Sequence, residues 1–379
     1  MAVYLDNAAT TPIAPEVVEA MIPVLREGFG NPSSSHSYGR KSKALIETSR
    51  RSIAKHLNCK PSEIIFTSGG TEADNMALFS AVNQLGVKHI ITSKIEHHAV
   101  GHTAECLGEC DGVKISYVNL NEKGRVDLKH LEELLRTDEK TMVSLMHANN
   151  EISTLLPLEE VSAICKKNNA LFHSDTVQTM GHYSFDLEKL GVDFITCAAH
   201  KFHGPKGIGF LYVNKSVSAE PLIHGGAQER GLRGGTENVY GIVGLAKAMD
   251  LAYEDVKAHQ NHVQSLKTYM MEELIKAIPN VEFHGETDPA YSLYTVLNVC
   301  FPKTDKSSML LFTLDLKGVA VSGGSACSSG ASVGSHVLTN INADMTRPNA
   351  RFSFSRYTTK EEIDFALEQV KSCFEKTLA

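Results

Sequence analysis

Lys201 is the residue around which a catalytic site is best assembled from this sequence. It follows an apolar run at residues 192–197, whose length and β-branched content predict a buried strand, and it opens a turn-rich loop. A partly buried amine loses its proton readily and forms a Schiff base with an aldehyde. A solvated loop lysine is the alternative interpretation. It suits Lys206 better, because that residue lies between Pro205 and Gly207 in a turn.

Asp175 and Lys201 together supply the two polar contacts that a pyridoxal ring needs. Asp175 follows the apolar run at 170–173, where a carboxylate can pair with a protonated ring nitrogen while Lys201 holds the aldehyde. Gln178 lies close to it in sequence. His97 follows another apolar run, and a neutral imidazole there can stack on a heteroaromatic ring or move protons. Asp175 alone would equally suit a helix N-cap.

Glycine-rich turns precede two predicted helices and suit anion binding. Gly69, Gly70 and Thr71 open a helix after a short apolar run. Backbone amides, a hydroxyl and the positive end of the helix dipole can meet a phosphate there. The segment 233–238, which contains Thr236, has a similar pattern with an arginine. For both segments, plain helix capping is the alternative.

Substrate contacts are expected from Asn150 and Arg351. Asn150 follows a strand-like run, where its amide can hold a ligand oxygen or satisfy a turn. Arg351 opens a segment of alternating apolar and polar residues. Its guanidinium can grip a carboxylate with two hydrogen bonds or make a surface ion pair.

Cys327 differs from the other cysteines because it lies in a stretch rich in glycine, serine and alanine at 322–334. Few apolar residues are available there to bury it, and a thiol on such a loop can swing towards a substrate as a nucleophile. Cysteines inside apolar segments need no function beyond packing.

A second group of sulfur and imidazole side chains recurs at four-residue spacing: His98, His102, Cys106 and Cys110. On a helix these side chains share one face and resemble metal ligands. One short helix rarely closes a four-ligand site, and the spacings of zinc sites differ. A partly exposed helix surface is therefore the favoured interpretation.

The composition limits the partners of the chain. A net charge of −7 disfavours general binding to nucleic acids or anionic membranes. No apolar run is long enough to span a bilayer, and the N-terminus lacks the features of a signal peptide. We expect a cytoplasmic protein whose scattered cysteines are reduced.

The elements that must position these residues belong to an α/β fold. Seven short apolar runs between residues 64 and 213, separated mostly by helix-length segments, predict a mostly parallel seven-stranded sheet with helices on both faces. Ligands bind such sheets at the carboxyl ends of the strands. We assign 16–255 to this large domain, and 1–15 with 256–379 to a smaller α+β domain that carries Cys327.

In this order, the motifs resemble those of the pyridoxal-phosphate cysteine desulfurases of the NifS/IscS type, within the class V aminotransferases of fold type I. The resemblance covers nearly the whole chain. Each motif alone is weak, but their joint presence is highly specific. The motifs lie at residues 4–12, 30–34, 67–72, 96–97, 149–151, 200–207, 233–236, 324–327 and 351–353.

The resemblance implies a role for each residue around a pyridoxal 5'-phosphate ring. Lys201 would be the Schiff-base lysine, and His97 would stack on the ring. Asp175 would pair with the ring nitrogen and Gln178 with the ring oxygen, with Asn150 near the ligand.

The phosphate and the substrate would be held by other residues. Arg351 would bind the carboxylate of L-cysteine, and Cys327 would take its sulfur as a persulfide. The phosphate would be held by Gly70, Thr71, His200 and, from the partner subunit of a homodimer, Thr236.

One position departs from the family pattern. Many members have Ser-Gly-His-Lys where this chain has Ala198-Ala199-His200-Lys201. The missing hydroxyl removes one hydrogen bond to the phosphate, which weakens cofactor binding by about 1.5–3 kcal/mol unless a neighbour compensates.

The implied activity converts L-cysteine to L-alanine and passes the persulfide to an iron–sulfur scaffold or another sulfur-acceptor protein. No resident metal is expected, although Cys327 is a candidate transient ligand of an iron–sulfur cluster. The alternative is a class V aminotransferase or a β-lyase acting on another amino acid, which would share Lys201 but have no use for Cys327. A binding protein with a decayed site is disfavoured, because every expected polar residue except the one at 198 is present.

Overall fold

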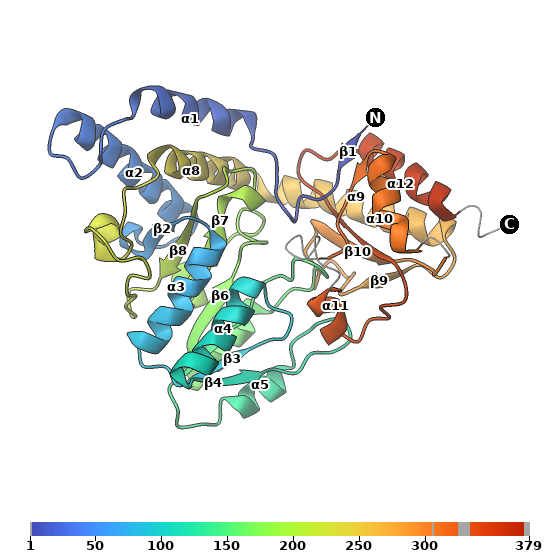
Figure 1. Cartoon of the computed structure of the whole chain (residues 1–379), viewed down its shortest axis with the longest axis horizontal. Helices are drawn as coiled ribbons and strands as arrows, with labels where there is room; N and C mark the ends of the chain where they lie inside the picture. The colour runs from blue at the N-terminus through green and yellow to red at the C-terminus, as the bar shows by residue number, and fades with distance from the viewer. Residues whose placement is uncertain (1, 305–306, 325–333, 375–379) are drawn as a thin grey trace.

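The computed structural model describes residues 2–304, 307–324 and 334–374, so Cys327 lies outside the described residues (Figure 1). The α-helices are α1 (Pro15–Glu27), α2 (Ser37–His56), α3 (Gly70–Asn83), α4 (His98–Asp111), α5 (Leu128–Leu134), α6 (Leu158–Lys167), α7 (Leu187–Leu190), α8 (Val239–Tyr253), α9 (Val256–Ala277), α10 (Leu310–Leu316), α11 (His336–Asn340) and α12 (Lys360–Phe374). The strands are β1 (Val3–Tyr4), β2 (Ile64–Thr67), β3 (His89–Thr92), β4 (Lys114–Tyr117), β5 (Thr141–Ser144), β6 (Leu171–Asp175), β7 (Phe194–Ala198), β8 (Gly209–Val213), β9 (Glu282–His284), β10 (Val296–Cys300), β11 (Val319–Ala320) and β12 (Asn349–Ser353).

The large sheet has seven strands in the order β2-β8-β7-β6-β5-β3-β4. From β7 to β4 every neighbouring pair is parallel, whereas β8 runs antiparallel to both β7 and β2. The segment between β7 and β8 is too short for a helical crossover, so it returns the chain as a hairpin-like connection. The predicted mostly parallel sheet of seven strands is confirmed.

Side chains of the large sheet alternate between two apolar layers, as the edge strand β2 shows. Ile64 and Phe66 of β2 join the core formed with α1, α2 and α8, whereas Ile65 joins the core formed with α3 and α4. All three side chains are buried. Both faces of the sheet are therefore covered, and ligands can reach it only at its edges and ends.

A second group of elements contains the sheet β12-β10-β9, which is antiparallel, and helices α9 and α12, which pack on one another. Strand β1 pairs in parallel with β11, so the N-terminus joins the C-terminal elements (Figure 1). The domain boundary expected at 255 falls between α8 and α9. The division into two domains stays a prediction.

The segment after β1 runs between the two groups of elements. The backbone amide of Ala8 donates to Ser353 Oγ at 2.8 Å, and that of Thr11 donates to the carbonyl of His200 at 2.9 Å. The N-terminal segment at residues 8–11 thus contacts both β12 and the loop that carries Lys201. Among the described residues, no helix combines the length and the apolar character needed to cross a membrane.

Candidate active site

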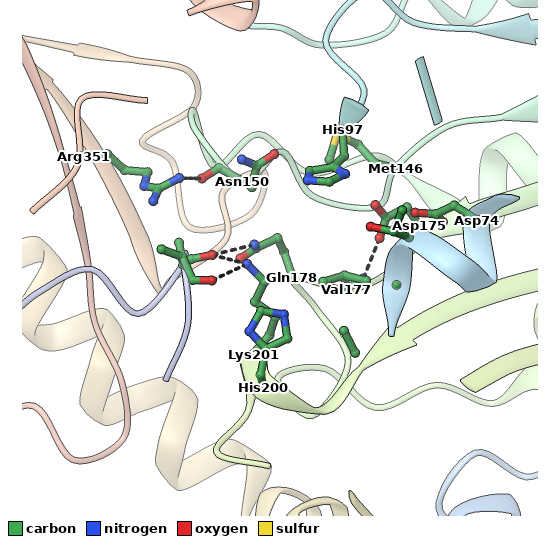
Figure 2. Close-up of a pocket in the computed structure, with 15 residues that line it drawn as sticks. Asp74, His97, Met146, Asn150, Asp175, Val177, Gln178, His200, Lys201 and Arg351 are labelled. Carbon is green, nitrogen blue, oxygen red and sulfur yellow. Dashed lines mark hydrogen bonds between the residues drawn. The ribbon is translucent and has the colours of Figure 1, made fainter. Parts of the chain in front are cut away.

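A cavity of about 230 Å³ opens at the carboxyl ends of β5, β6 and β7, beside the first turn of α3 (Figure 2). Nine of the predicted site residues line it together with residues that the sequence did not single out. The lining residues are Ala8, Ala9, Gly70, Thr71, Asp74, His97, Met146, Asn150, Asp175, Val177, Gln178, Ala198, His200, Lys201 and Arg351.

Lys201 lies in a short 3-10 helix, Ala199–Lys201, directly after β7. Its Nζ donates hydrogen bonds to the carbonyls of Ala8 at 2.5 Å and Ala9 at 2.9 Å. These contacts hold the amine inside the cavity (Figure 2). Lys206 is exposed and lies outside the cavity lining, as its turn sequence suggested.

Asp175 ends β6 as a buried carboxylate, and the amide of Val177 donates to its Oδ1 at 2.8 Å. Burial, and then repulsion from Asp74, raise the pKa of Asp175 to about 7. The chain continues after Asp175 as a turn rather than an α-helix, so the helix N-cap interpretation is wrong. A cationic group in the cavity would stabilise the ionised carboxylate.

Asp74 is a second buried carboxylate in the same wall, and its pKa is raised to about 7 by burial. Its Oδ1 lies 3.4 Å from Nε2 of His173. Burial lowers the pKa of His173 to about 4, so the imidazole is neutral at pH 7. This side of the cavity therefore carries acidic groups without a compensating protonated imidazole.

His97 is the N-cap residue of α4, and its Nδ1 accepts a hydrogen bond from the amide of Ala99 at 3.1 Å. This bond leaves the ring proton on Nε2 in the neutral form. Burial, followed by the nearby charge of Lys201, lowers the pKa of His97 to about 4. A neutral imidazole that lines the cavity suits stacking on a flat ring (Figure 2).

Glu96 precedes His97 and is buried behind the cavity. Its carboxylate oxygens accept hydrogen bonds from the amide of Met146 at 3.0 and 3.2 Å, and Oε1 accepts one from Ser93 Oγ at 2.8 Å. Burial nevertheless raises the pKa of Glu96 to about 8. Glu96 thus fastens the loop that carries His97 to the end of β5.

The first turn of α3 forms the other end of the cavity. A Cβ on Gly70 would lie 2.8 Å from Cγ2 of Val177, so only glycine fits this close approach. The first amides of a helix lack partners within it, so they can face an anion. Thr71 and His200 also line the cavity, as does Ala198, at the position where the sequence departs from the expected family pattern.

Arg351 is the middle residue of β12 and is 1% exposed. Its Nη1 donates to the carbonyl of Asn150 at 2.9 Å, and its Nη2 contacts Asp6 Oδ1 at 2.8 Å. Its Nε is buried and has no hydrogen-bond partner among the described residues. The surface ion pair considered from the sequence is therefore wrong, because the Arg351 side chain is buried and Asp6 is only partly exposed.

Of the predicted residues that the structure describes, Thr236 does not line the cavity. Thr236 is exposed and lines a separate cleft with Ser68 and Gly207. Cys327 lies outside the described residues. On either side of its segment, Ser322 Oγ donates to Asp6 Oδ2 at 2.8 Å and Ser335 Oγ donates to Glu151 Oε2 at 2.5 Å.

Five cavity residues were not identified from the sequence as ligand contacts: Ala8, Ala9, Asp74, Met146 and Val177. Asp74 lies four residues after Gly70 on α3, and this helical spacing, which places both on one face, would have identified it. Met146 follows β5 directly. Ala8 and Ala9 contribute backbone carbonyls to Lys201, and a backbone contact leaves no signal in the residue type.

The four residues His98, His102, Cys106 and Cys110, which were considered as metal ligands, all lie on α4. The ring centroids of His98 and His102 lie 4.6 Å apart, those of His98 and His336 lie 4.5 Å apart, and the sulfurs of Cys106 and Cys110 are 3.9 Å apart. Within the described ranges, no group of three or more potential ligands is placed to hold a metal ion.

Comparisons with known proteins agree with the motifs. The family model described as Aminotransferase class-V matches residues 3–365. The cysteine desulfurase IscS of Dictyoglomus turgidum is 45% identical over 378 residues, which cover 99% of this chain and 95% of that protein. The family resemblance inferred from the sequence is thereby confirmed.

Solved structures agree as well. A NifS-like protein superposes with a TM-score of 0.91 at 39% identity, covering 99% of this chain and 100% of the other. The structure described as SspA in complex with cysteine has a TM-score of 0.80 at 32% identity, with 94% and 99% of the two chains covered.

Because burial raises the pKa of Glu96, the free energy of unfolding should depend on pH. The unfolded chain ionises this carboxyl near 4.5, whereas the folded chain keeps its proton until about pH 8. Between these values the folded state binds more protons, so this group lowers stability as the pH rises. We expect the melting temperature of Glu96→Gln, relative to the unmutated chain, to increase steadily from pH 5 to pH 8.

Scanning calorimetry across this pH range measures the difference. Glu361→Gln, at an exposed position of α12, is the matched control and should show no such trend. A difference between Glu96→Gln and the unmutated chain that does not change with pH would contradict the buried, protonated state of Glu96.

Proposed function

We propose that this chain, which belongs to the class-V aminotransferase family, is a pyridoxal-phosphate-dependent cysteine desulfurase that converts L-cysteine to L-alanine. Full-length relatives named cysteine desulfurase support the activity, and the SspA structure supports cysteine as the substrate. The observation that carries the proposal is the grouping of Lys201, Asp175 and Arg351 around one cavity.

The residues of the cavity fit pyridoxal 5'-phosphate. The Lys201 amine would hold its aldehyde, the buried carboxylate of Asp175 its ring nitrogen, and the first turn of α3 its phosphate. Gly70 is the strongest sign of a cradle, because a Cβ there would collide with Val177. The neutral ring of His97 would lie against the cofactor ring, with Gln178 and Asn150 beside it and His200 and Thr71 near the phosphate.

The substrate carboxylate would bind at Arg351. A guanidinium that already contacts Asp6 and Asn150 is held in one orientation, and its buried Nε still offers a donor. Fixed guanidinium donors match the two oxygens of a carboxylate. We place the α-carboxylate of L-cysteine at this guanidinium, so that the α-carbon is directed towards Lys201.

Proton movement would be carried out by Lys201. With pyridoxal 5'-phosphate in the cavity, an Nζ of Lys201 that is not bound to it would accept the proton from the substrate α-carbon. When bound, the cofactor supplies an electron sink, and the ionised Asp175 keeps its ring nitrogen protonated. The carbonyls of Ala8 and Ala9 keep the amine at this position.

Sulfur would leave the substrate on Cys327. The Cys327 thiolate attacks the substrate sulfur, the carbon–sulfur bond breaks as the sulfur–sulfur bond forms, and the electron pair left on carbon takes a proton to give the methyl group of alanine. We further propose a homodimer in which the partner's Thr236 contacts the phosphate, and an iron–sulfur scaffold or another sulfur-acceptor protein as the recipient of the persulfide.

A class V aminotransferase or a β-lyase is the alternative within this family. It would use the same Lys201 and Asp175 but would form its products without Cys327. The two functions therefore differ in the consequence of removing one thiol.

Product analysis tests the function directly. With L-cysteine and a thiol reductant, we expect the unmutated chain to form alanine and sulfide in equal amounts. Cys327→Ser should lose both products while it keeps the visible absorbance of the cofactor, because its thiol acts after cofactor binding. The cysteine on α12 provides the matched control Cys373→Ser, which should retain activity. Equal activity in Cys327→Ser would favour the lyase or aminotransferase.

Replacing Ala198 with serine should increase the affinity of the protein for the cofactor. A serine hydroxyl at this cavity position can donate to the phosphate, so Ala198→Ser should bind the cofactor about 1.5–3 kcal/mol more tightly, on the order of 10–100-fold in Kd. Titration of the cofactor-free protein by absorbance measures this change.

Ala258→Ser on α9 is the matched control for an added hydroxyl far from the cavity, and its affinity should equal that of the unmutated chain. Weaker or unchanged binding by Ala198→Ser would contradict a phosphate position within hydrogen-bond reach of residue 198.

A further inference from the structure

Asp74 is a buried acid of the cavity that the proposed function leaves without a role. It lies one turn after Gly70 on α3, is 1% exposed, and lines the cavity together with Asp175, which ends β6. Helix α3 packs on β6, and Figure 2 shows both carboxyl groups at the same end of the cavity. Two acids from separate elements therefore face the same ligand space.

The imidazole next to Asp74 does not offset its negative charge. Asp74 Oδ1 has no hydrogen-bond partner among the residues that the structure describes, although Nε2 of His173 lies 3.4 Å away. The His173 ring lies between two hydroxyl groups, with Nδ1 2.8 Å from Ser144 Oγ and Nε2 3.2 Å from Thr196 Oγ1. Burial lowers the pKa of His173 to about 4, so this ring is neutral at pH 7 and provides no counter-charge.

The cationic side chains that line the cavity have other partners. Lys201 donates to backbone carbonyls, and Arg351 pairs with Asp6 on the side of the cavity opposite Asp74 (Figure 2). Burial, and then the charge of Asp74, raise the pKa of Asp175 to about 7, and the opposing charge of Lys201 does not cancel them.

The other titratable groups near the two acids are uncharged at pH 7. Burial, with smaller contributions from Asp175 and Asp74, raises the pKa of Glu96 to about 8, so this carboxyl keeps its proton. Burial and then the charge of Asp175 raise the pKa of Cys197 on β7, so its thiol is protonated. Burial lowers the pKa of His97 to about 4. None of these three groups supplies a positive charge.

In these surroundings the ionisation of one acid opposes that of the other. Burial favours the neutral form of each carboxyl, and two carboxylates in one site repel one another, so the pair keeps a proton to a higher pH than either acid does in water. Burial accordingly raises the pKa of Asp74 to about 7. Without a ligand, Asp74 and Asp175 therefore hold about one proton between them at pH 7.

We propose that Asp74 is a second acid of the ring-nitrogen site, which holds a proton jointly with Asp175 until the protonated ring nitrogen of pyridoxal 5'-phosphate displaces it. On binding, one oxygen–hydrogen bond of the pair breaks and the proton leaves to the solvent, with no change in oxidation state. Both carboxylates then face a cationic ring. The proposal rests on the proposed function only in requiring that the cofactor binds in this cavity.

The pH dependence of cofactor affinity tests the role of Asp74. When binding releases protons, the logarithm of the affinity rises with pH, and its slope equals the number of protons released. Full-length, cofactor-free protein is titrated with pyridoxal 5'-phosphate by absorbance from pH 6 to pH 8. We expect the slope of Asp74→Asn to be smaller than that of the unmutated chain by roughly 0.5–1. Protons exchanged by Lys201 and by the phosphate are common to both proteins and cancel in this difference.

Asp111→Asn, at the exposed end of α4, is the matched control and should keep the slope of the unmutated chain. Circular dichroism checks that each variant is folded. Equal slopes in Asp74→Asn and the unmutated chain would overturn the proposal but leave cofactor binding, and with it the proposed function, intact. An unmutated chain that binds no cofactor would refute both.

Infrared spectroscopy of the cofactor-free protein decides the question even if Asp74→Asn fails to bind the cofactor. The carbonyl band of protonated carboxyl groups is followed against pH. The difference between each protein and the same protein with Asp175→Asn isolates the band of Asp175. We expect this band to disappear at a lower pH in Asp74→Asn than in the unmutated chain, because the repulsion between the two acids is removed. An unchanged titration of Asp175 would contradict the joint holding of a proton.

Discussion

The hydrogen bonds of the N-terminal segment are the constraint on which the site depends. Ala8 donates to Ser353 of β12 and accepts from Lys201, and Thr11 donates to the carbonyl of His200. These bonds join the lysine loop of the large sheet to the strand that carries Arg351. Without these bonds, no backbone segment would connect the Lys201 loop to β12, and the Lys201 amine and the Arg351 guanidinium would not be fixed at the same cavity.

Burial then sets the charge state of the cavity. Burial away from water lowers the pKa of the imidazoles of His97 and His173, which are therefore neutral. The same burial raises the pKa of the carboxyl groups of Asp74 and Asp175. A cofactor ring that brings a protonated nitrogen would relieve this cost at Asp175. Asp175 thus presents a buried carboxyl group that a cationic ligand would stabilise in its ionised form.

Much of this arrangement could be predicted from the sequence, because its residues follow apolar runs. His97, Asn150 and Lys201 come after strands, and Asp175 ends one. A parallel sheet brings such positions to one end. The sequence could not provide contacts made by backbone or between distant segments. The carbonyls of Ala8 and Ala9 have no side-chain signature. The partner of Arg351 is Asp6, at the other end of the chain, and residue types alone do not reveal such a pair.

The central claim is that Lys201 carries the cofactor, and chemical fixation tests it most directly. Borohydride reduction of the cofactor-loaded protein makes the lysine–cofactor bond permanent, and peptide mass analysis then locates the label. We expect the label on Lys201, with none in Lys201→Ala. A label on the exposed Lys206, or a full label in Lys201→Ala, would contradict this assignment.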